Sequence, residues 1–439
     1  MKKSLWTDGV KLNEFNALDK DIKTDVLIIG GGLCGLLCAH FLQQCGVDYV
    51  LVEADKIARG TTENTTAKIT VQHGIIYKKI IDSYGFERAK MYLDANCKAL
   101  AEYERLCGNI NCDFEKKDAY TYSLTNRDKL EKEVEAVNSL GLKCDYVKNT
   151  ELPFKNEGAI RLENQAQFNP LKFIGGFAQG LNVYEKTFVK EFAPHKAVTE
   201  KGFEIRAEKI IVTTHFPFIN NHGGYFLKLY QHRSYVSAFS GMTKLKGMYV
   251  DEDEKGMSFR SYGDYILVGG GGHRTGKQSD GWYGIEKLVE NIYPDAMVKY
   301  RWAAQDCMSL DGIPYIGKYS KSTPDMYVAT GFNKWGMTSS MVSAMILTDM
   351  VQGKKNDFEE VFSPRRSMLK PQLFINGFEA TVNLLTPSTR RCPHLGCALK
   401  WNKAEHTWDC PCHGSRFEEN GELINGPSTG SAKVNKKYH

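Results

Sequence analysis

Apolar and polar positions near the start of the chain predict a strand, a tight turn, a helix and a second strand. Val26–Ile29 is a short, fully apolar run, which is typical of a buried strand. A helical pattern follows over Cys34–Gly46, and the run from Val47 to Glu53 predicts the next strand. This order predicts a βαβ unit.

Further along, the pattern alternates between helical and β-type segments. We expect helices over about 77–107 and 127–140, and another over Asn169–Gly180 with Asn169 as its cap. Apolar runs predict strands at Glu208–Pro217 and Met326–Phe332, and β-type runs dominate from about 225 to 275. A last helix is expected to end at Gly353. The mixed order predicts an interleaved α/β body.

The sequence indicates a domain boundary near Phe362–Arg366. Beyond it we expect short strands and turns around a cysteine cluster. A length of 439 residues suits two or three domains. The net charge of +5 is spread along the chain, so a nucleic-acid partner is not indicated. The most apolar stretch, Val26–Ala39, is too short to span a membrane, and no signal peptide is recognisable. We expect no transmembrane segment and a cytoplasmic location.

The cysteines divide the chain in the same way. Eight of the twelve are scattered from Cys34 to Cys307, as free thiols would be in a reducing compartment. The remaining four lie in two short motifs, CPHLGC and CPCHGS. Each motif offers one cysteine and one histidine, and the four candidate metal ligands are Cys392, His394, Cys410 and His413.

Two kinds of metal centre can use such a set. Cys2His2 ligands hold structural zinc, but zinc-finger spacing places a cysteine pair first and a histidine pair later. Here each loop mixes the two types and carries Pro and Gly, which favours a Rieske [2Fe–2S] cluster. In such a cluster the thiolates bind one iron and the imidazoles bind the other, which raises the reduction potential above that of all-cysteine clusters.

Residues 366–439 resemble Rieske proteins. The resemblance implies a disulfide between Cys397 and Cys412, although two free thiols would suit a reducing cytosol. Ser415 matches the family's serine that donates to a cluster sulfide, and Gly426-Pro427 matches its proline loop. Phe417 stands where high-potential members have Tyr. Because a donor to sulfur is lost, we expect a mid-range potential.

The turn after the first predicted strand has the form G-x-G-x-x-G. Gly30, Gly32 and Gly35 follow a strand and open a helix, and Glu53 ends the next strand. This context predicts a dinucleotide site, with the glycines admitting the pyrophosphate and the acid binding ribose hydroxyls. A glycine turn in a nucleotide-free sheet is the alternative. The glycines of Val268–Gly276 do not fit the same spacing, so no NAD(P)H site is predicted.

Three segments favour FAD as the dinucleotide. Thr61 and Thr62 lie in a hydroxyl-rich stretch that could line phosphates and flavin. Asp311–Gly317 and Ala329–Thr338 resemble the flavin-closing segments of the D-amino-acid oxidase, glycine oxidase and sarcosine oxidase superfamily, and the resemblance covers about 22–365. It implies a helix N-terminus near the flavin pyrimidine. The residues expected there are Gly331, Gly336, Met337 and Thr338.

These observations predict a fold class: an α/β, Rossmann-type FAD-binding domain interleaved with an α+β substrate domain, followed by a small all-β Rieske domain. The expected ranges are 1–365 for the oxidoreductase (FAD-binding about 22–80, 155–215 and 300–365; substrate-binding about 81–154 and 216–299) and 366–439 for the Rieske domain.

The two cofactors together indicate a function. Flavin accepts two electrons and a [2Fe–2S] cluster moves one, so we expect a dehydrogenase that oxidises a small organic substrate and passes electrons singly through the cluster to or from a soluble protein. The resemblance implies an amine or amino acid. The alternative is a non-catalytic electron carrier or redox sensor. No two-His, one-carboxylate iron site of the kind that ring-hydroxylating oxygenases need is recognisable.

The catalytic residues are less clear from the sequence. His273, Arg260 and His73 are candidates, since Arg260 could hold a carboxylate and His73 could approach the flavin. Structural roles are at least as common for such residues. Cys307 lies near the position where sarcosine oxidases attach flavin, but its spacing differs and no covalent bond is expected.

Overall fold

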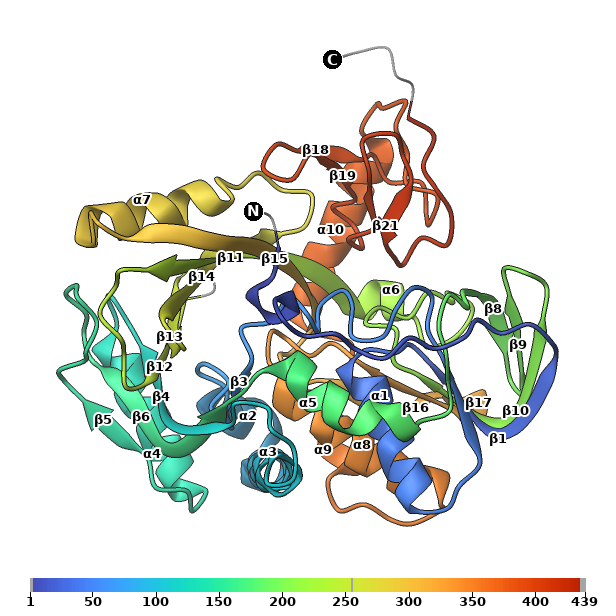
Figure 1. Ribbon diagram of the computed structural model, residues 1–439, viewed down its shortest axis with the longest axis horizontal. Coiled ribbons are helices and arrows are strands. Elements are labelled where there is room, and N and C mark those ends of the chain that lie inside the picture. The colour runs from blue at the N-terminus through green and yellow to red at the C-terminus, as the bar shows by residue number, and fades with distance from the viewer. Residues whose placement is uncertain (1–2, 254–255, 435–439) are drawn as a thin grey trace.

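The computed structural model describes residues 3–253 and 256–434, and this part of the chain forms three β-sheets with helices packed around them (Figure 1). Figure 1 shows the C-terminal domain, in red, above the strands of the larger body. Among the described helices, none combines the length and apolarity that crossing a bilayer requires.

An eight-stranded sheet forms around the predicted βαβ unit. The second half of β1 is buried, and β1 pairs in parallel with β2 and β10. Strands β7 and β17 extend the parallel part, and β16 runs antiparallel to β17. The strands are β1 (Ile22–Ile29), β2 (Tyr49–Val52), β7 (Val183–Tyr184), β8 (Val189–Ala193), β9 (Lys196–Thr199), β10 (Glu204–Val212), β16 (Tyr315–Ser320) and β17 (Thr323–Thr330). Parallel strands bring their carboxyl ends to one edge, where α/β proteins bind ligands.

A nine-stranded sheet, mostly antiparallel, forms the second part of the body. Its order is β15-β11-β14-β13-β12-β4-β6-β3, with β5 beside β6. The strands are β3 (Lys68–Ile69), β4 (Glu115–Tyr122), β5 (Asp145–Val147), β6 (Ala159–Gln167), β11 (Leu229–Ser240), β12 (Met248–Asp251), β13 (Ser258–Tyr262), β14 (Tyr265–Arg274) and β15 (Met297–Ser309). The β-type runs expected over about 225–275 are therefore confirmed as strands.

The two sheets alternate along the chain, as an interleaved body requires. Strand β6 lies within a stretch that the sequence assigns to the FAD-binding part, and β15 lies mostly within another, yet both strands pair within the nine-stranded sheet. Pairing alone does not divide a chain into domains, so the residue boundaries stay predictions.

Helices cover the sheets, and they differ from the predicted pattern in a division at Gly85 and in two longer helices that were not predicted, Trp282–Ile292 and Pro371–Leu385. The body contains α1 (Leu33–Gln44), α2 (Tyr77–Tyr84), α3 (Phe86–Cys107), α4 (Arg127–Ser139), α5 (Pro170–Phe177), α6 (Tyr225–Lys228), α7 (Trp282–Ile292), α8 (Gly336–Val351) and α9 (Glu359–Phe362), with 3-10 turns at Leu5–Thr7 and Ala178–Gly180. The pattern predicted over about 77–107 is two helices, because Gly85 at φ 87 interrupts it.

The difference with most bearing on the C-terminal region is α10 (Pro371–Leu385), which the sequence did not predict. It begins with Pro371 at its first turn, and it precedes a four-stranded antiparallel sheet. That sheet consists of β18 (Lys400–Asn402), β19 (Thr407–Asp409), β20 (Arg416–Phe417) and β21 (Leu423–Asn425). The expectation of only strands and turns beyond 366 was therefore wrong for 371–385.

Candidate functional site

The predicted nucleotide turn lies between β1, α1 and the end of β2. Gly30 has φ 111, a conformation that glycine adopts freely, and Gly31 N donates to Glu53 Oε2 at 2.6 Å. Burial raises the pKa of the Glu53 carboxyl. A Cβ on Gly35 would lie 2.0 Å from Gly30 O, so only glycine lets α1 approach the turn this closely. The third glycine of the motif therefore serves helix packing.

The hydroxyl-rich segment closes over this turn. Thr62 Oγ1 accepts from Leu33 N at 3.1 Å, which satisfies a free N–H at the start of α1. Thr61 Oγ1 donates to Gln305 O in β15 at 2.8 Å. The segment thereby joins the glycine turn to the nine-stranded sheet.

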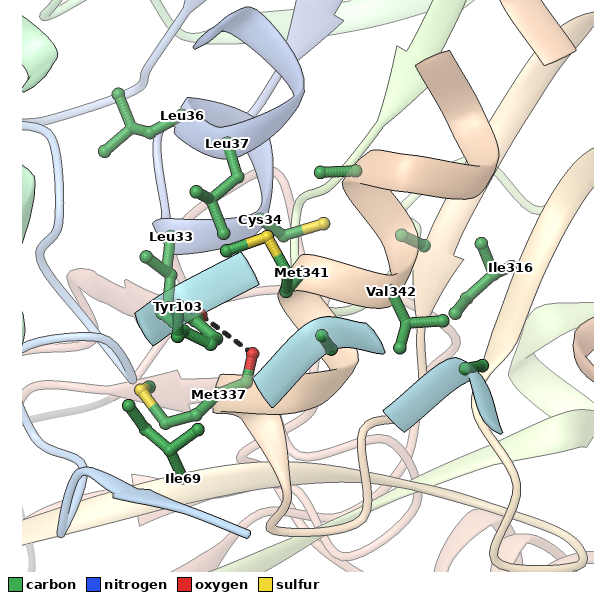
Figure 2. Packing of buried hydrophobic residues seen from close by; sticks show 14 of the residues in the cluster. Leu33, Cys34, Leu36, Leu37, Ile69, Tyr103, Ile316, Met337, Met341 and Val342 are labelled. Carbon is green, nitrogen blue, oxygen red and sulfur yellow. Dashed lines mark hydrogen bonds between the residues drawn. The ribbon is translucent and has the colours of Figure 1, made fainter. Parts of the chain in front are cut away.

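The N-terminus of α8 reaches the same region after a tight turn. Gly331, Asn333 and Lys334 all have positive φ, and the helix begins at Gly336. Its first turn packs against α1 and α3, where Tyr103 Oη donates to Met337 O at 2.9 Å (Figure 2). These contacts fix the direction in which the free N–H groups of α8 point.

The structure brings most of the predicted cofactor residues to one cavity of about 1910 Å³. Eight of them line it: Gly30, Gly32, Glu53, Thr61, Thr62, Gly331, Gly336 and Met337. The other two lie directly behind its wall. Gly35 packs against Gly30, and the Thr338 hydroxyl bonds to His73.

His73 lines the cavity, but both of its ring nitrogens have partners. Nδ1 lies 2.6 Å from Tyr92 Oη, and Nε2 lies 2.9 Å from Thr70 O and from Thr338 Oγ1. Its ring stacks on Trp335 at 4.9 Å. Burial lowers its pKa to about 3, so the ring is neutral at physiological pH. This arrangement suits a residue that holds the start of α8.

The other two candidates from the sequence, His273 and Arg260, do not line the cavity. His273 stacks on Tyr235 and bonds to Gly271 O. Arg260 is fully buried, and its Nη1 donates to Thr66 O and Ala67 O, both at 2.7 Å. Arg260 Nε and Nη2 have no hydrogen-bond partner among the described residues. Burial lowers the pKa of Arg260 to about 9.

Lys68 is a second cation in this region, half-buried, which the sequence did not single out. It lines the cavity, and burial together with the nearby Arg260 charge lowers its pKa to about 7. Its place among the hydroxyls of Arg59–Thr70 was the available signal, because a lone lysine amid threonines and alanine is unusual on a buried strand. Of these two cations only Lys68 lines the cavity, whereas the Arg260 guanidinium packs against the rings of Trp6 and Tyr262.

The two predicted cluster loops have matching backbone geometry. Cys392 N donates to Cys397 O and Gly396 N donates to Cys392 O, both at 2.9 Å. In the second loop, Cys410 N donates to Ser415 O at 2.8 Å and Gly414 N to Cys410 O at 2.9 Å. A disulfide between Cys397 and Cys412 joins the loops, as the resemblance implied.

The candidate ligands of the two loops converge. The rings of His394 and His413 lie 4.9 Å apart, and the Cys392 and Cys410 thiols are within hydrogen-bonding reach of each other. Each histidine uses Nε2 for a protein contact: His394 with the Asn220 side chain and His413 with Phe226 O. Both Nδ1 atoms are buried and have no partner in the described chain. Two orphaned imidazole nitrogens beside two thiols fit the ligand set of a Rieske cluster.

The cluster loops are held by residues of the body that the sequence did not single out. Gln305 Nε2 donates to Gly414 O and Gln231 Nε2 to His413 O, both at 2.8 Å. Arg274 Nε donates to Pro411 O at 3.0 Å. Gln231 and Gln305 also line the large cavity. No local motif marks such residues, because they are defined by contacts more than a hundred positions away.

Comparisons with known proteins agree with this architecture. The family model for the DAO FAD dependent oxidoreductases matches residues 25–350, and the model for the Rieske [2Fe-2S] domain matches 384–436. The chain therefore belongs to the DAO family of FAD-dependent oxidoreductases and carries a C-terminal Rieske domain. Its cofactors are FAD and a [2Fe–2S] cluster, as the sequence predicted.

One similar protein spans nearly the whole chain. YhfW of Bacillus subtilis, which is named as a Rieske 2Fe-2S iron-sulfur protein, is 34% identical over 96% of this chain and 95% of its own length. The cytochrome b6-f complex iron-sulfur subunit of Nostoc punctiforme is 51% identical over 37 residues, 8% of this chain and 21% of that protein.

Solved structures share the fold of the body. Glycine oxidase from Geobacillus kaustophilus gives a TM-score of 0.66 at 18% identity, covering 79% of this chain and 99% of its own. L-proline dehydrogenase from P. horikoshii gives 0.66 at 15%, with 79% and 98% covered. L-amino acid deaminase from Proteus vulgaris gives 0.62 at 18%, with 82% and 97% covered. The predicted fold class is confirmed.

Proposed function

We propose that this FAD-dependent oxidoreductase is a dehydrogenase of a small organic substrate, an amine or amino acid, whose electrons pass singly through the Rieske cluster. The observation that carries the proposal is the position of Gln305. Its backbone oxygen accepts from Thr61 in the flavin segment, and its side chain donates to Gly414 in the cluster loop. A single residue thus bonds to both cofactor regions.

For FAD, we propose that the glycine turn and Glu53 hold the dinucleotide. Gly30 and Gly32 would admit the pyrophosphate to the start of α1, Gly35 keeps α1 close, and Glu53 would accept ribose hydroxyls. Thr61 and Thr62 would line the phosphates and flavin. At the other end, N–H groups at the start of α8 would stabilise negative charge on the reduced flavin. The residues assigned there are Gly331, Gly336, Met337 and Thr338.

For the cluster, we propose that Cys392 and Cys410 bind one iron and that Nδ1 of His394 and of His413 binds the other. The unpartnered Nδ1 atoms support this assignment. The Nε2 contacts to Asn220 and Phe226 orient the rings, as hydrogen bonds to the other ring nitrogen of metal-binding histidines do. Flavin and cluster together supply the chemistry that splits a two-electron oxidation into single-electron transfers.

The charge of the site supports a substrate that carries a carboxylate. Lys68 lines the cavity, and the charge of the buried Arg260, which packs against Trp6 and Tyr262, acts on it from nearby. A carboxylate in the cavity would pair with Lys68 and offset the repulsion between these two like charges. The names of the structural relatives refer to glycine, L-proline and L-amino acids, which all carry such a group.

The main alternative is a carrier that exchanges electrons with proteins and binds no metabolite. A carrier would be expected to have a shallow or blocked space over its flavin. The cavity of about 1910 Å³ includes the proposed FAD site and exceeds the roughly 300–1,000 Å³ of a typical ligand site, so it can hold a small substrate in addition to FAD. This volume favours the dehydrogenase.

An anaerobic screen of amines and amino acids tests the proposal. We expect one compound to bleach the flavin absorbance and to reduce the cluster, as seen by its electron paramagnetic resonance signal. Removing the carboxylate from that compound should raise KM by about tenfold to a hundredfold, the loss of one or two charge-assisted bonds. If no metabolite bleaches the flavin while a reduced ferredoxin exchanges electrons rapidly, the protein is a carrier.

A further inference from the structure

Helix α10 presents an unusual apolar surface to solvent. Of the thirteen large hydrophobic side chains exposed in the described chain, eight fall within 369–395. Phe374 and Phe378 are each 69% exposed and Leu385 is 76% exposed. The eight are Leu369, Phe374, Ile375, Phe378, Val382, Leu384, Leu385 and Leu395, and we call them the α10 surface. Concentrated apolar exposure of this kind marks an interaction site.

The opposite side of α10 is polar and buried, which is the reverse of an ordinary surface helix. Asn376 is 6% exposed, and its Oδ1 accepts from Arg274 Nη1 at 2.8 Å. Asn383 is 4% exposed, and its backbone oxygen accepts from Ala398 N. Glu379 forms an ion pair of 2.6 Å with Lys277. These polar contacts fix the helix with its apolar side outward.

The flanks of the helix are basic. Between residues 363 and 399 the basic side chains are Arg365, Arg366, Lys370, Arg390 and Arg391, of which Arg366 is buried and paired with Asp311, and Glu379 supplies the single acid. Glu379 is already paired with Lys277, so it cannot offset the positive charge around the α10 surface. Arg365 is exposed, and Lys370 is half-buried against Tyr84. The residues around the α10 surface therefore favour a negatively charged partner.

We propose that the α10 surface docks onto an anionic lipid membrane. A 15-residue helix is about 22 Å long, too short to cross a bilayer but suited to lie flat at its interface. Helices that bind in this way bury an apolar face of Phe and Leu, while nearby Lys and Arg contact anionic headgroups. A second copy of the chain fits less well, because the two basic flanks would repel each other.

Docking would bring the cluster loops to the lipid surface. Leu395, which is 41% exposed, follows His394 directly in the first loop. The Leu384 side chain lies beside Gly396, and Ala380 packs against the core of the Rieske domain. The α10 surface and the first cluster loop thus form one continuous face.

Vesicle flotation of the full-length holoprotein tests this proposal. We expect binding to vesicles of phosphatidylglycerol and phosphatidylcholine in equal parts, with at least about tenfold weaker binding to phosphatidylcholine alone. The double variant Phe374→Ser/Phe378→Ser should lose at least about tenfold in affinity for the anionic vesicles. Tyr283→Ser is the matched control, because Tyr283 is 64% exposed on α7, and it should bind as the unaltered protein does.

A second double variant distinguishes a loss of membrane contact from a folding defect. Arg365→Glu/Lys370→Glu changes two side chains outside the buried core, so it should keep the flavin and cluster spectra and still lose vesicle binding. The proposal is overturned if the unaltered protein does not float with anionic vesicles, or if both double variants bind as it does. It is also overturned if the α10 surface instead mediates self-association, seen as a dimer in light scattering that the Phe variant dissociates.

Discussion

At the scale of single residues, the glycine motif combines two roles, lining the cavity and packing α1 against the turn, and Gly35 has only the second. Gly30 and Gly32 line the cavity, whereas Gly35 lies behind it and lets α1 contact the turn. A methyl group there would lie 2.0 Å from Gly30 O and 2.8 Å from Thr213 Oγ1. Neither neighbour is the free end of a flexible side chain, so the helix itself would have to move.

We therefore expect Gly35→Ala to lower the free energy of unfolding by about 1–3 kcal/mol and to reduce the bound FAD. Chemical denaturation and the flavin content of purified protein measure both effects. Gly284→Ala is the control, since Gly284 also lies in a helix and a Cβ there meets nothing within 4 Å. That variant should be neutral or up to about 1 kcal/mol more stable. Equal behaviour of the two variants would contradict the packing role.

The sequence predicts site residues where a local motif marks them and does not predict residues that lack such a motif. Gly30, Glu53 and the four predicted ligands stand in spaced motifs, and the structure gathers them at two centres. Asn220, Gln231 and Gln305 contact the cluster loops, but they come from strands and turns far away along the chain. Their roles depend on tertiary contacts that no spacing encodes.

At the scale of elements, an ion-pair network joins β11 to the hairpin between β18 and β19. Arg233 Nε donates to Glu405 Oε2 at 2.7 Å, and Arg416 Nη2 donates to Glu405 Oε1 at 3.1 Å. The three side chains are at most 11% exposed. Burial alone would raise the pKa of Glu405, but the two guanidinium groups outweigh it and lower this pKa to about 2.

Glu405→Gln should therefore destabilise the docked Rieske domain by about 3–5 kcal/mol, because it leaves buried arginines without their carboxylate. Denaturation followed by cluster absorbance measures this loss. Glu360→Gln breaks the exposed pair with Arg88 and should cost no more than about 1 kcal/mol. Similar losses in the two variants would show that the network is not buried in solution.

The same network predicts a pH dependence. Since the folded pKa of Glu405 is lowered from 4.5 to about 2, its stabilisation is complete above about pH 4.5 and is lost as the pH falls toward 2. In Glu405→Gln this part of the acid transition should be absent.

Helix α10 shows where element prediction failed. Its apolar residues follow a helical stripe, but a glycine, two asparagines and β-branched residues interrupt it. The apolar stripe of a helix is normally expected to face the core, whereas in α10 it faces solvent and the asparagines are buried. The strands β1 and β2 were predicted correctly because their runs are buried on both sides.

At the scale of the whole molecule, the two cofactor regions form one unit. The cavity that begins at Gly30 extends to Gly426 and Pro427 of the predicted proline loop. The sequence predicted both cofactors but not that their domains share a wall, because that wall is formed by β11 and β15 together with the cluster loops. The proposed route for electrons depends on this contact.

Removing the cluster should separate substrate oxidation from electron delivery. In Cys410→Ser one proposed iron ligand is lost, so we expect no cluster signal and at least about a tenfold lower turnover with a one-electron acceptor protein. Flavin bleaching by the substrate in a single anaerobic turnover should stay within about twofold, because the residues around Gly30 and Glu53 are unchanged. Cys45→Ser, at an exposed free cysteine, should alter neither rate. If turnover with the acceptor persists in Cys410→Ser, electrons leave the flavin directly and the cluster serves another purpose.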